Sequence, residues 1–249
     1  MGFFRDKIEY YTQAIEFNPK DVKAYNNRGI AYREARNYKE AIKDYTKAIK
    51  LDPKNAIYYI NRGDAYRELR KYNRAIKDFT QAIELDPKNA EYYSSRGKMY
   101  YYELKNYDRG IEDYTQTIEL DPENAQYYRS RGIAYYKLKN YDQAIADYTK
   151  AITLNPKFSW YYKHRGDAYY ELQNYDQAMA DYTQAIKLDP RFSWYYKRRA
   201  DVYYELKNYD QAKKDAKKAC ELGDCELWNI LNSVGVYGSN RKRSRLTQK

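Results

Sequence analysis

This sequence contains few of the residues that most catalytic and metal sites need. Its 249 residues include one histidine, His164, and two cysteines, Cys220 and Cys225. Zinc sites and Ser–His or Cys–His nucleophile pairs depend on these side chains. The ten glycines form no glycine-rich phosphate loop. We therefore expect no catalysis, no metal ion and no cofactor, and we expect His164 to be a surface residue within a packed repeat.

Long apolar runs and a targeting segment are also missing. No stretch of 18 or more apolar residues occurs, and the N-terminal residues MGFFRDKIEYY have no apolar core and no small-residue cleavage site. A disulfide between Cys220 and Cys225 is geometrically conceivable, but two thiols in a chain without a signal more often stay reduced. We therefore expect a cytoplasmic protein with reduced cysteines.

The net charge is strongly positive. The chain carries 46 Lys and Arg against 35 Asp and Glu, a net charge of +11, and its isoelectric point is about 9.2. Basic residues together with many aromatic ones are typical of nucleic-acid binding, so RNA or another nucleic acid is an alternative partner. The last nine residues, RKRSRLTQK, hold five basic residues and no acid. This concentration in the tail weakens the case for nucleic-acid binding by the folded body.

One motif recurs along the whole chain. Six prolines stand at positions 19, 53, 87, 122, 156 and 190, spaced by 34 residues and once by 35. The stretch NRGIAY, which begins at Asn27, returns with variations in every later copy. A fixed period of this length is typical of helical hairpins stacked in a row. The six predicted repeats are residues 22–55, 56–89, 90–124, 125–158, 159–192 and 193–226.

Each repeat is predicted to contain two helices. The first follows Pro-Lys-Asn, where Asn55 can cap the free first-turn amides. It is expected to end at an asparagine, because asparagine tolerates the left-handed conformation that ends a helix. These asparagines are Asn37, Asn106, Asn140, Asn174 and Asn208. The second helix is expected to open at an aspartate such as Asp108. The third repeat has one extra residue, which predicts a helical bulge or a longer turn near residues 100–106.

The repeat resembles the tetratricopeptide repeat, which has Trp, Leu, Gly, Tyr, Ala, Phe and Pro at fixed places. In the first repeat the matching residues are Tyr25, Arg28, Gly29, Tyr32, Ala41, Tyr45 and Pro53. The resemblance covers residues 6 to about 226. It implies an all-α fold, a right-handed α-solenoid (superhelix) of stacked antiparallel helix pairs. It also implies that the first helices line an inner surface that receives a peptide.

Arginine takes the place of the family's leucine in every repeat, and an aspartate recurs at a fixed offset in the second helices. This double recurrence predicts buried structural ion pairs at the hairpin contact, the alternative being arginines that extend into solvent. The predicted pairs are Arg28 with Asp44, Arg62 with Asp78, Arg96 with Asp113, Arg131 with Asp147, Arg165 with Asp181, and Arg199 with Asp215. Because losing one partner leaves a buried charge, Asp147→Ala should destabilise far more than loss of a surface acid.

The two ends depart from the repeat pattern. Residues 1–21 match a second helix with no first helix before it, and such a half repeat leaves an apolar face that can stack on another chain. Homo-oligomers are therefore an open alternative. Residues 225–234 carry an apolar stripe and are predicted to form a C-terminal capping helix, because one face of a terminal repeat must be closed. Residues 235–249 are predicted to be a flexible basic tail.

The most distinctive residues of the inner surface lie in the fifth and sixth repeats, which share a Trp-Lys-Asp-Tyr set. Aromatic and cationic side chains together suit a peptide with apolar anchors and acidic or polar flanks. The predicted groove residues are Arg129, Tyr136, Trp160, Lys163, Asp167, Tyr170, Trp194, Lys197, Asp201 and Tyr204. We therefore predict a non-enzymatic scaffold that binds a peptide or partner protein in its concave groove. Packing of the tryptophans between neighbouring repeats is the alternative.

Overall fold

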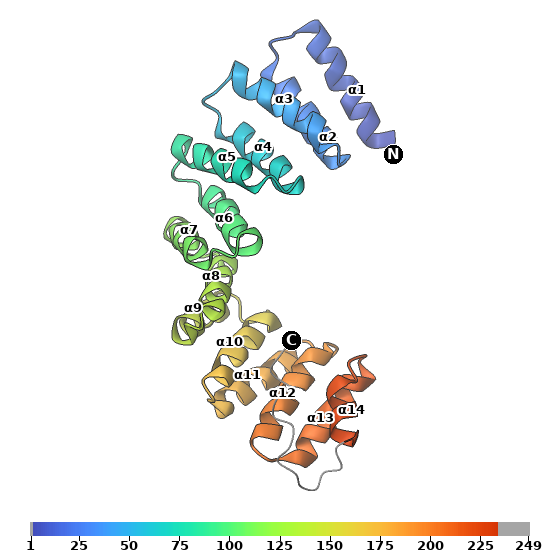
Figure 1. Ribbon diagram of the computed structural model, residues 1–249, viewed down its shortest axis with the longest axis vertical. Coiled ribbons are helices and arrows are strands. Elements are labelled where there is room, and N and C mark those ends of the chain that lie inside the picture. The colour runs from blue at the N-terminus through green and yellow to red at the C-terminus, as the bar shows by residue number, and fades with distance from the viewer. Residues whose placement is uncertain (1, 234–249) are drawn as a thin grey trace. The chain divides into compact units, whose positions relative to one another are not determined.

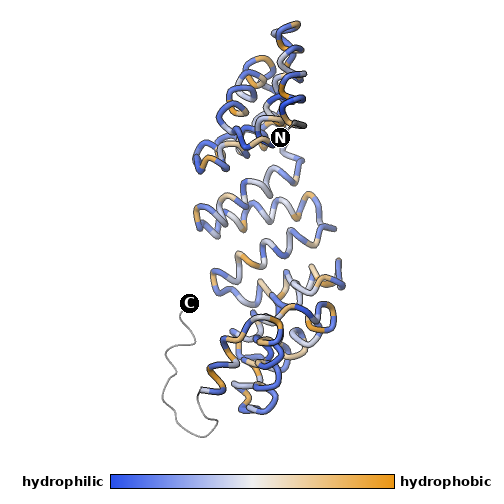
Figure 2. The backbone as a smooth tube through the Cα atoms, turned by 90° about the vertical axis from the view of Figure 1, so that its right-hand side faces the viewer, coloured by the Kyte–Doolittle hydropathy of each residue, from blue (hydrophilic) through white to orange (hydrophobic). Residues whose placement is uncertain are grey.

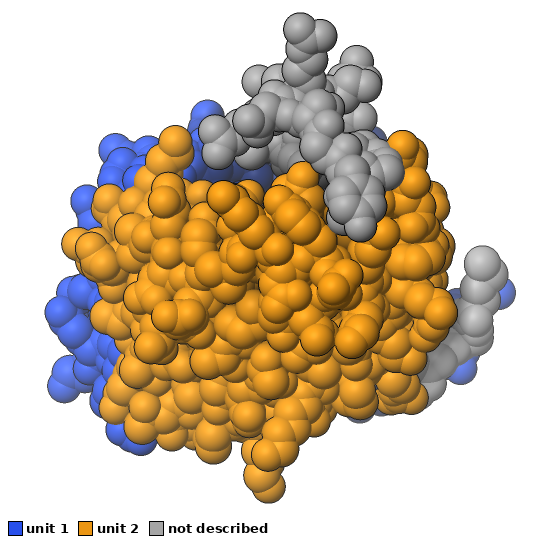
Figure 3. All heavy atoms as spheres, turned by 90° about the horizontal axis from the view of Figure 1, so that it is seen from below, with its two compact units in different colours: residues 1–138 blue, residues 139–249 orange. Residues whose placement is uncertain are grey.

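The computed structural model describes residues 2–233, and every regular element in that range is a helix. Two compact units are distinguished, unit 1 (Met1–Leu138) and unit 2 (Lys139–Lys249), which are coloured separately in Figure 3. The predicted flexible tail, residues 235–249, lies outside the described residues. The all-α class is confirmed, and the handedness of the superhelix stays a prediction.

Within each unit the helices follow one another as hairpins, each packed on its neighbours in sequence (Figure 1). The helices of unit 1 are α1 (Gly2–Phe17), α2 (Val22–Glu34), α3 (Tyr38–Leu51), α4 (Ala56–Glu68), α5 (Tyr72–Leu85), α6 (Ala90–Lys98), the π-helix η1 (Met99–Glu103), α7 (Tyr107–Leu120) and α8 (Ala125–Lys137). Those of unit 2 are α9 (Tyr141–Leu154), α10 (Ser159–Glu171), α11 (Tyr175–Leu188), α12 (Ser193–Glu205), α13 (Tyr209–Glu221) and α14 (Glu226–Ser233). The predicted stacking of helix pairs is therefore confirmed.

A glycine in the first helix faces an aromatic ring of the second helix. A Cβ atom added at Gly63 would lie 2.6 Å from Cε1 of Phe79, so no larger residue fits without movement. The sixth repeat has Ala200 in place of this glycine, and Ala200 clusters with Ala216, which stands where the other repeats have the ring. The small residue and the ring therefore form one steric pair, which explains why both change together in the last repeat.

The turn between the two helices of a repeat differs from the prediction by one residue. The left-handed residue is the one before the asparagine: Arg36 has φ 59°, whereas Asn37 has φ −89°. The same conformation recurs at Arg70, Lys105, Lys139, Gln173 and Lys207. The asparagine N–H closes the helix end, since Asn37 donates to the Tyr32 carbonyl at 2.7 Å. The asparagine is therefore the residue that precedes the second helix, at its N-cap position.

The second helices also begin earlier than predicted. Helix α7 starts at Tyr107, and the Asn106 side chain accepts a hydrogen bond from the Arg109 N–H. Asp108 lies within the first turn, where its charge favours the positive end of the helix dipole. The first helices begin as expected, because the Asn55 side chain accepts from the Ile57 N–H at 3.1 Å.

Tyrosine at the family's tryptophan position holds the repeat boundary. The Tyr59 hydroxyl donates to the Pro53 carbonyl at 3.2 Å, so the first helix is tied to the proline that precedes it. Equivalent bonds join Tyr93 to Pro87, Tyr162 to Pro156, and Tyr196 to Pro190. In this chain the tyrosine hydroxyl, a group that tryptophan lacks, is therefore the donor that makes this contact.

The extra residue of the third repeat is absorbed in the π-helix Met99–Glu103, which confirms the predicted bulge. The Leu104 N–H donates to the Met99 carbonyl at 3.2 Å, the five-residue step of a π-helix. Tyr101 is buried within this turn and Tyr102 is 53% exposed. The insertion therefore changes the local backbone while Arg96 and Asp113 still meet.

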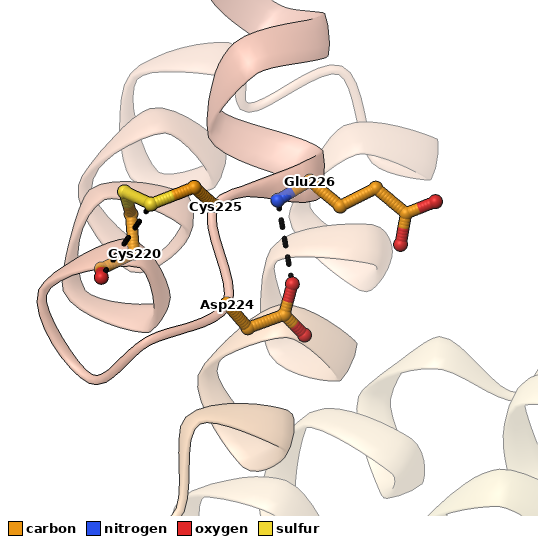
Figure 4. The surroundings of a disulfide bond; sticks show 4 residues. All are labelled: Cys220, Asp224, Cys225 and Glu226. Carbon is orange, nitrogen blue, oxygen red and sulfur yellow. Dashed lines mark hydrogen bonds between the residues drawn. A yellow bond between two sulfur atoms is a disulfide. The ribbon is translucent and has the colours of Figure 1, made fainter.

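Helix α14 covers the last repeat of unit 2. Its Leu227 and Leu231 are buried against Ala200, Ala212 and Ala216. Cys220 and Cys225 form a disulfide that joins the end of α13 to the residue before α14 (Figure 4). The expectation of reduced cysteines is therefore wrong, because the tight turn between the two helices places the two sulfur atoms together.

Hydrophobic residues are spread in short stretches along the helices (Figure 2). None of the helices in residues 2–233 combines the length and the apolar character that a bilayer crossing requires.

Candidate functional site

The recurring arginine binds the recurring aspartate through two parallel hydrogen bonds. Arg28 Nε and Nη2 donate to Asp44 Oδ2 and Oδ1, both at 2.8 Å. The same geometry, at 2.7–3.0 Å, joins Arg62 to Asp78, Arg96 to Asp113, Arg165 to Asp181, and Arg199 to Asp215. Of the remaining predicted pair, Arg131 belongs to unit 1, and Asp147 belongs to unit 2 and is 5% exposed.

Each arginine also reaches the preceding repeat. Arg62 Nη1 donates to Thr46 Oγ1 at 3.2 Å, and Thr46 lies on the second helix of the repeat before. The other bonds of this kind are Arg28 to Thr12, Arg96 to Thr80, Arg131 to Thr115, Arg165 to Thr149, and Arg199 to Thr183. Our sequence reasoning missed these threonines, although each stands 16 residues before its arginine. The network links repeats and leaves the arginines little capacity for a ligand.

Burial works against the ionised form of these pairs. Desolvation raises the pKa of the Asp113 and Asp181 carboxyls, and the hydrogen bonds from Arg96 and Arg165 only partly oppose it. Conversely, the hydrogen bond to Asp44 raises the pKa of Arg28 in spite of burial. Such pairs contribute little net stability but penalise the loss of one partner.

The predicted aromatic and cationic residues of unit 2 form one connected cluster on α10 and α12. The Lys163 ammonium lies 4.1 Å from the centroid of the Trp194 ring and 5.7 Å from that of Trp160. Trp160 packs against Phe192, with ring centroids 5.0 Å apart. Both tryptophans are half-buried, so packing between repeats and partial exposure occur together. We call Trp160, Lys163, Tyr170, Trp194 and Arg198 the aromatic–cation wall.

Asp167 does not lie open on this wall. It is 6% exposed, accepts a hydrogen bond from the Tyr182 hydroxyl at 2.8 Å, and forms ion pairs with Lys163 at 3.1 Å and Arg198 at 3.3 Å. Contact of Asp167 with a ligand stays a prediction, and in this structure its carboxylate is already engaged by three donors. Its buried carboxylate needs these donors, and in return it fixes the two cations of the wall.

Arg198 is the wall residue that sequence reasoning missed. Its guanidinium lies 4.8 Å from the Tyr170 centroid and 5.3 Å from the Trp194 centroid, and Nη1 donates to Asp201 at 3.2 Å. The other repeats have Asn, Ser or His at its position, so the arginine was a detectable departure. Burial alone would lower the pKa of Arg198, but Tyr182, Asp167 and Asp201 raise it, so the group stays charged.

Lys197, the last predicted lysine, is engaged by the chain's own C-terminal turn. Its ammonium contacts Glu226 Oε2 at 2.5 Å and Asp224 Oδ2 at 3.6 Å. Burial tends to lower the pKa of Lys197, but the hydrogen bond to Glu226 and the charge of Asp224 raise it overall. Tyr204, on the same helix, is 42% exposed.

The predicted groove residues of unit 1 are Arg129 and Tyr136, both on α8 and both half-buried. Within the described residues, the Arg129 Nε atom is buried and makes no hydrogen bond.

The described part of the chain offers no cluster of side chains suited to binding a metal ion. Residues 2–233 contain no group of three His, Cys, Asp or Glu side chains placed to hold a metal ion. His164 is not a plain surface residue, because its ring stacks on Tyr148 at a centroid distance of 5.5 Å and lies 6.0 Å from Trp160.

Family models for the tetratricopeptide repeat match most of the chain, at residues 22–55, 44–77, 125–158 and 195–222. A further TPR repeat model matches residues 63–101, 100–139 and 166–207. The chain belongs to the tetratricopeptide repeat family. Repeats of this family are interaction modules, so this membership supports a role in protein–protein interaction.

Several tetratricopeptide repeat structures share the fold. A crystal structure of MamA is 28% identical, with a TM-score of 0.62, over 64% of this chain and 93% of that one. The C-terminal part of a repeat protein from Cytophaga hutchinsonii is 20% identical, with a TM-score of 0.75, over 88% and 92%. YrrB, described as having an unusual peptide-binding site, is 21% identical, with a TM-score of 0.63, over 74% and 94%. No curated protein sequence matches the chain.

Proposed function

We propose that this chain is a non-enzymatic interaction scaffold that holds a peptide segment of a partner protein against the aromatic–cation wall of unit 2. The observation that carries the proposal is the connected cluster of Trp160, Lys163, Tyr170, Trp194 and Arg198 on successive first helices. Half-buried aromatic rings and fixed cations are the side chains that dominate binding energy at interfaces.

The wall is already ordered without a ligand. Asp167 fixes Lys163 and Arg198, so little side-chain freedom would be lost on binding. The rings offer apolar area, while the cations favour acidic or polar flanks in the partner segment. Membership of the tetratricopeptide repeat family also supports peptide binding here, because the first helices of its repeats line the inner, ligand-binding surface.

A selection from a phage-displayed library of random dodecapeptides tests the proposal. Selected peptides are synthesised, and their Kd values are measured with the intact chain and with a Trp160→Ala, Trp194→Ala double variant. We expect binding at least about tenfold weaker in the variant, since large aromatic contacts at interfaces typically contribute more than 1 kcal/mol each. Equal affinities would overturn the proposed site.

A matched pair of tyrosines separates local contact from loss of fold. Tyr204 on α12 is 42% exposed and Tyr102 in η1 is 53% exposed, so neither substitution leaves a core cavity. Tyr204→Ala should weaken peptide binding, whereas Tyr102→Ala should leave it unchanged. Thermal unfolding of both variants checks that the fold is retained.

Nucleic-acid binding is the second candidate, supported by the net charge of +11. A protein that neutralises phosphates loses affinity steeply with salt. RNA affinity that falls steeply with salt and survives deletion of residues 238–249 would favour this candidate over peptide binding. If the deletion abolishes RNA binding, the binding site for RNA lies in residues 238–249 and not in the folded repeats.

A further inference from the structure

One predicted groove residue of α12, Lys197, is engaged by a segment of the same chain. Lys197 lies on α12, next to Arg198, and two carboxylates contact its ammonium, one from the turn before α14 and one from the first residue of α14. These are Asp224 and Glu226, two residues apart (Figure 4). The Lys197 side chain is 24% exposed, and both of these acids contact its ammonium.

This turn is held in place by three independent features. Gly223 has φ 103°, and the following Asp224 N–H donates to the Ala219 carbonyl at 3.0 Å, which closes the end of α13. The Asp224 side chain accepts from the Glu226 N–H at 3.3 Å at the start of α14. The disulfide between Cys220 and Cys225 joins the two sides of the turn.

Helix α14 depends on this turn for its position. It has eight residues, a length at which an isolated helix does not persist in water. Its burial rests on Leu227 and Leu231, with Trp228 half-buried beside them. A covalent restraint at its first turn therefore matters for whether α14 stays docked and whether its acids stay on Lys197.

We infer that the α13–α14 turn is an internal competitor for Lys197, the predicted groove residue that precedes the wall residue Arg198 on α12, and that the Cys220–Cys225 disulfide keeps the turn there. Reduction frees Lys197 and makes it accessible to the partner peptide. The inference rests on the proposed function for its binding consequence, but release of the turn is a property of the chain alone.

The chemical step is thiol–disulfide exchange with an external dithiol. One thiolate of the dithiol attacks a cysteine sulfur, the Cys220–Cys225 bond breaks, and a mixed disulfide forms. The second thiol of the reagent displaces the remaining cysteine. Two electrons pass from the dithiol to the protein, which gains two thiols, and the reagent leaves as a cyclic disulfide.

Amide hydrogen exchange of the intact chain, with and without dithiothreitol, tests the release of the turn. We expect the amides of residues 226–233 to exchange about tenfold faster after reduction, since a closed loop limits opening. Lys197 should also be acetylated faster, while the exposed Lys187 of α11 should not change. Equal exchange in both states, or two free thiols in protein equilibrated with glutathione disulfide, would overturn the inference.

Two variants separate the contribution of the disulfide from that of the two acidic side chains. A Cys220→Ser, Cys225→Ser variant should exchange like the reduced protein and should not respond to dithiothreitol; a response would show that the effect has another source. An Asp224→Asn, Glu226→Gln variant keeps the disulfide but removes both charges. It should be acetylated faster at Lys197 in the oxidised state, and an unchanged rate would contradict the role of the two acids.

Peptides from the dodecapeptide selection then test competition. Binding that strengthens at least threefold on reduction supports the inference, and equal binding in both redox states contradicts it while leaving the proposed function intact. If no peptide binds in either state, the proposed function fails, and the hydrogen-exchange result still decides whether the disulfide holds the turn.

Discussion

At the scale of single residues, one arginine joins three helices. Arg62 donates to Asp78 within its own repeat and to Thr46 of the repeat before, while the rings of Tyr59 and Tyr66 lie 5.7 and 6.0 Å from its guanidinium. Leucine at this position would make only non-directional contacts. The planar fork of arginine instead fixes distance and orientation. The repeat interface is therefore specified by hydrogen bonds as well as by apolar packing.

Removing one partner of this network should be costly. Asp78 is 4% exposed, and Asp78→Ala leaves the half-buried Arg62 without its carboxylate. We expect a loss of about 3 kcal/mol in the free energy of unfolding, measured by urea denaturation. Glu84→Ala on the same helix, at an exposed position, should change it by less than about 0.5 kcal/mol. Similar losses in the two variants would contradict a buried ion pair.

Asp201 should make stability depend on pH. Burial raises the pKa of Asp201 from 3.8 to about 6, and Arg198 and Lys197 only partly oppose this rise. The folded chain therefore binds more protons than the unfolded chain between these values. This contribution to stability is complete below about pH 4 and is lost as the pH rises through about 6, a change of about 3 kcal/mol for a shift of about two pKa units. In Asp201→Asn, denaturation series from pH 4 to 7 should lack this component. An identical dependence of stability on pH in the variant would exclude a contribution from Asp201.

At the scale of helices, contact distance is set by pairs of a small residue and a ring. Gly63 allows Phe79 to touch the backbone of α4, and Gly29 and Gly166 make the same close fit with Tyr45 and Tyr182. Gly110 is different, because an added Cβ would meet its nearest neighbours at 3.5 Å, an ordinary contact distance. A methyl group therefore fits at Gly110 but not at Gly63.

Two alanine substitutions should therefore have opposite signs. Gly63→Ala forces the Phe79 ring to move and should destabilise by about 2 kcal/mol. Gly110→Ala adds no clash and improves helix propensity within α7, so it should stabilise by about 0.5–1 kcal/mol. Thermal unfolding of both variants measures the two signs. A stabilising Gly63→Ala would refute the close contact.

At the scale of the whole molecule, stability is distributed over neighbouring repeats. Within unit 1, and likewise within unit 2, each helix packs on the helices next to it in sequence. In such arrays the free energy is approximately a sum of repeat and neighbour contributions. A local defect should therefore stay local.

Hydrogen exchange of Asp78→Ala can measure this locality. We expect faster exchange in α4 and α5 and in the adjoining helices α3 and α6, because Arg62 also bonds Thr46 of α3, and Arg96 of α6 bonds Thr80 of α5. Exchange in α11 and α12 of unit 2 should be the same as in the unaltered chain. Uniformly faster exchange in both units would indicate a single cooperative unit instead.

Much of this protein could be predicted from the sequence, because it repeats. Six copies of one pattern determined the all-α class, the helix pairs, the bulge of the third repeat, and the offset between each arginine and its aspartate. Residues at the same position of different repeats have the same surroundings, and in this chain they make the same contacts, as the arginines do with the aspartates. The sequence by itself therefore determined the fold and the residues that hold it together.

Only the tertiary structure decided which of the predicted groove residues are accessible. Asp167 was predicted to face a ligand but is buried, Arg198 was overlooked but completes the wall, and Lys197 is covered by the turn that the disulfide closes. Accessibility depends on which side chains from other helices reach a given point. The repeat pattern gives a residue's place on its own helix, whereas burial is set by neighbours that differ from repeat to repeat.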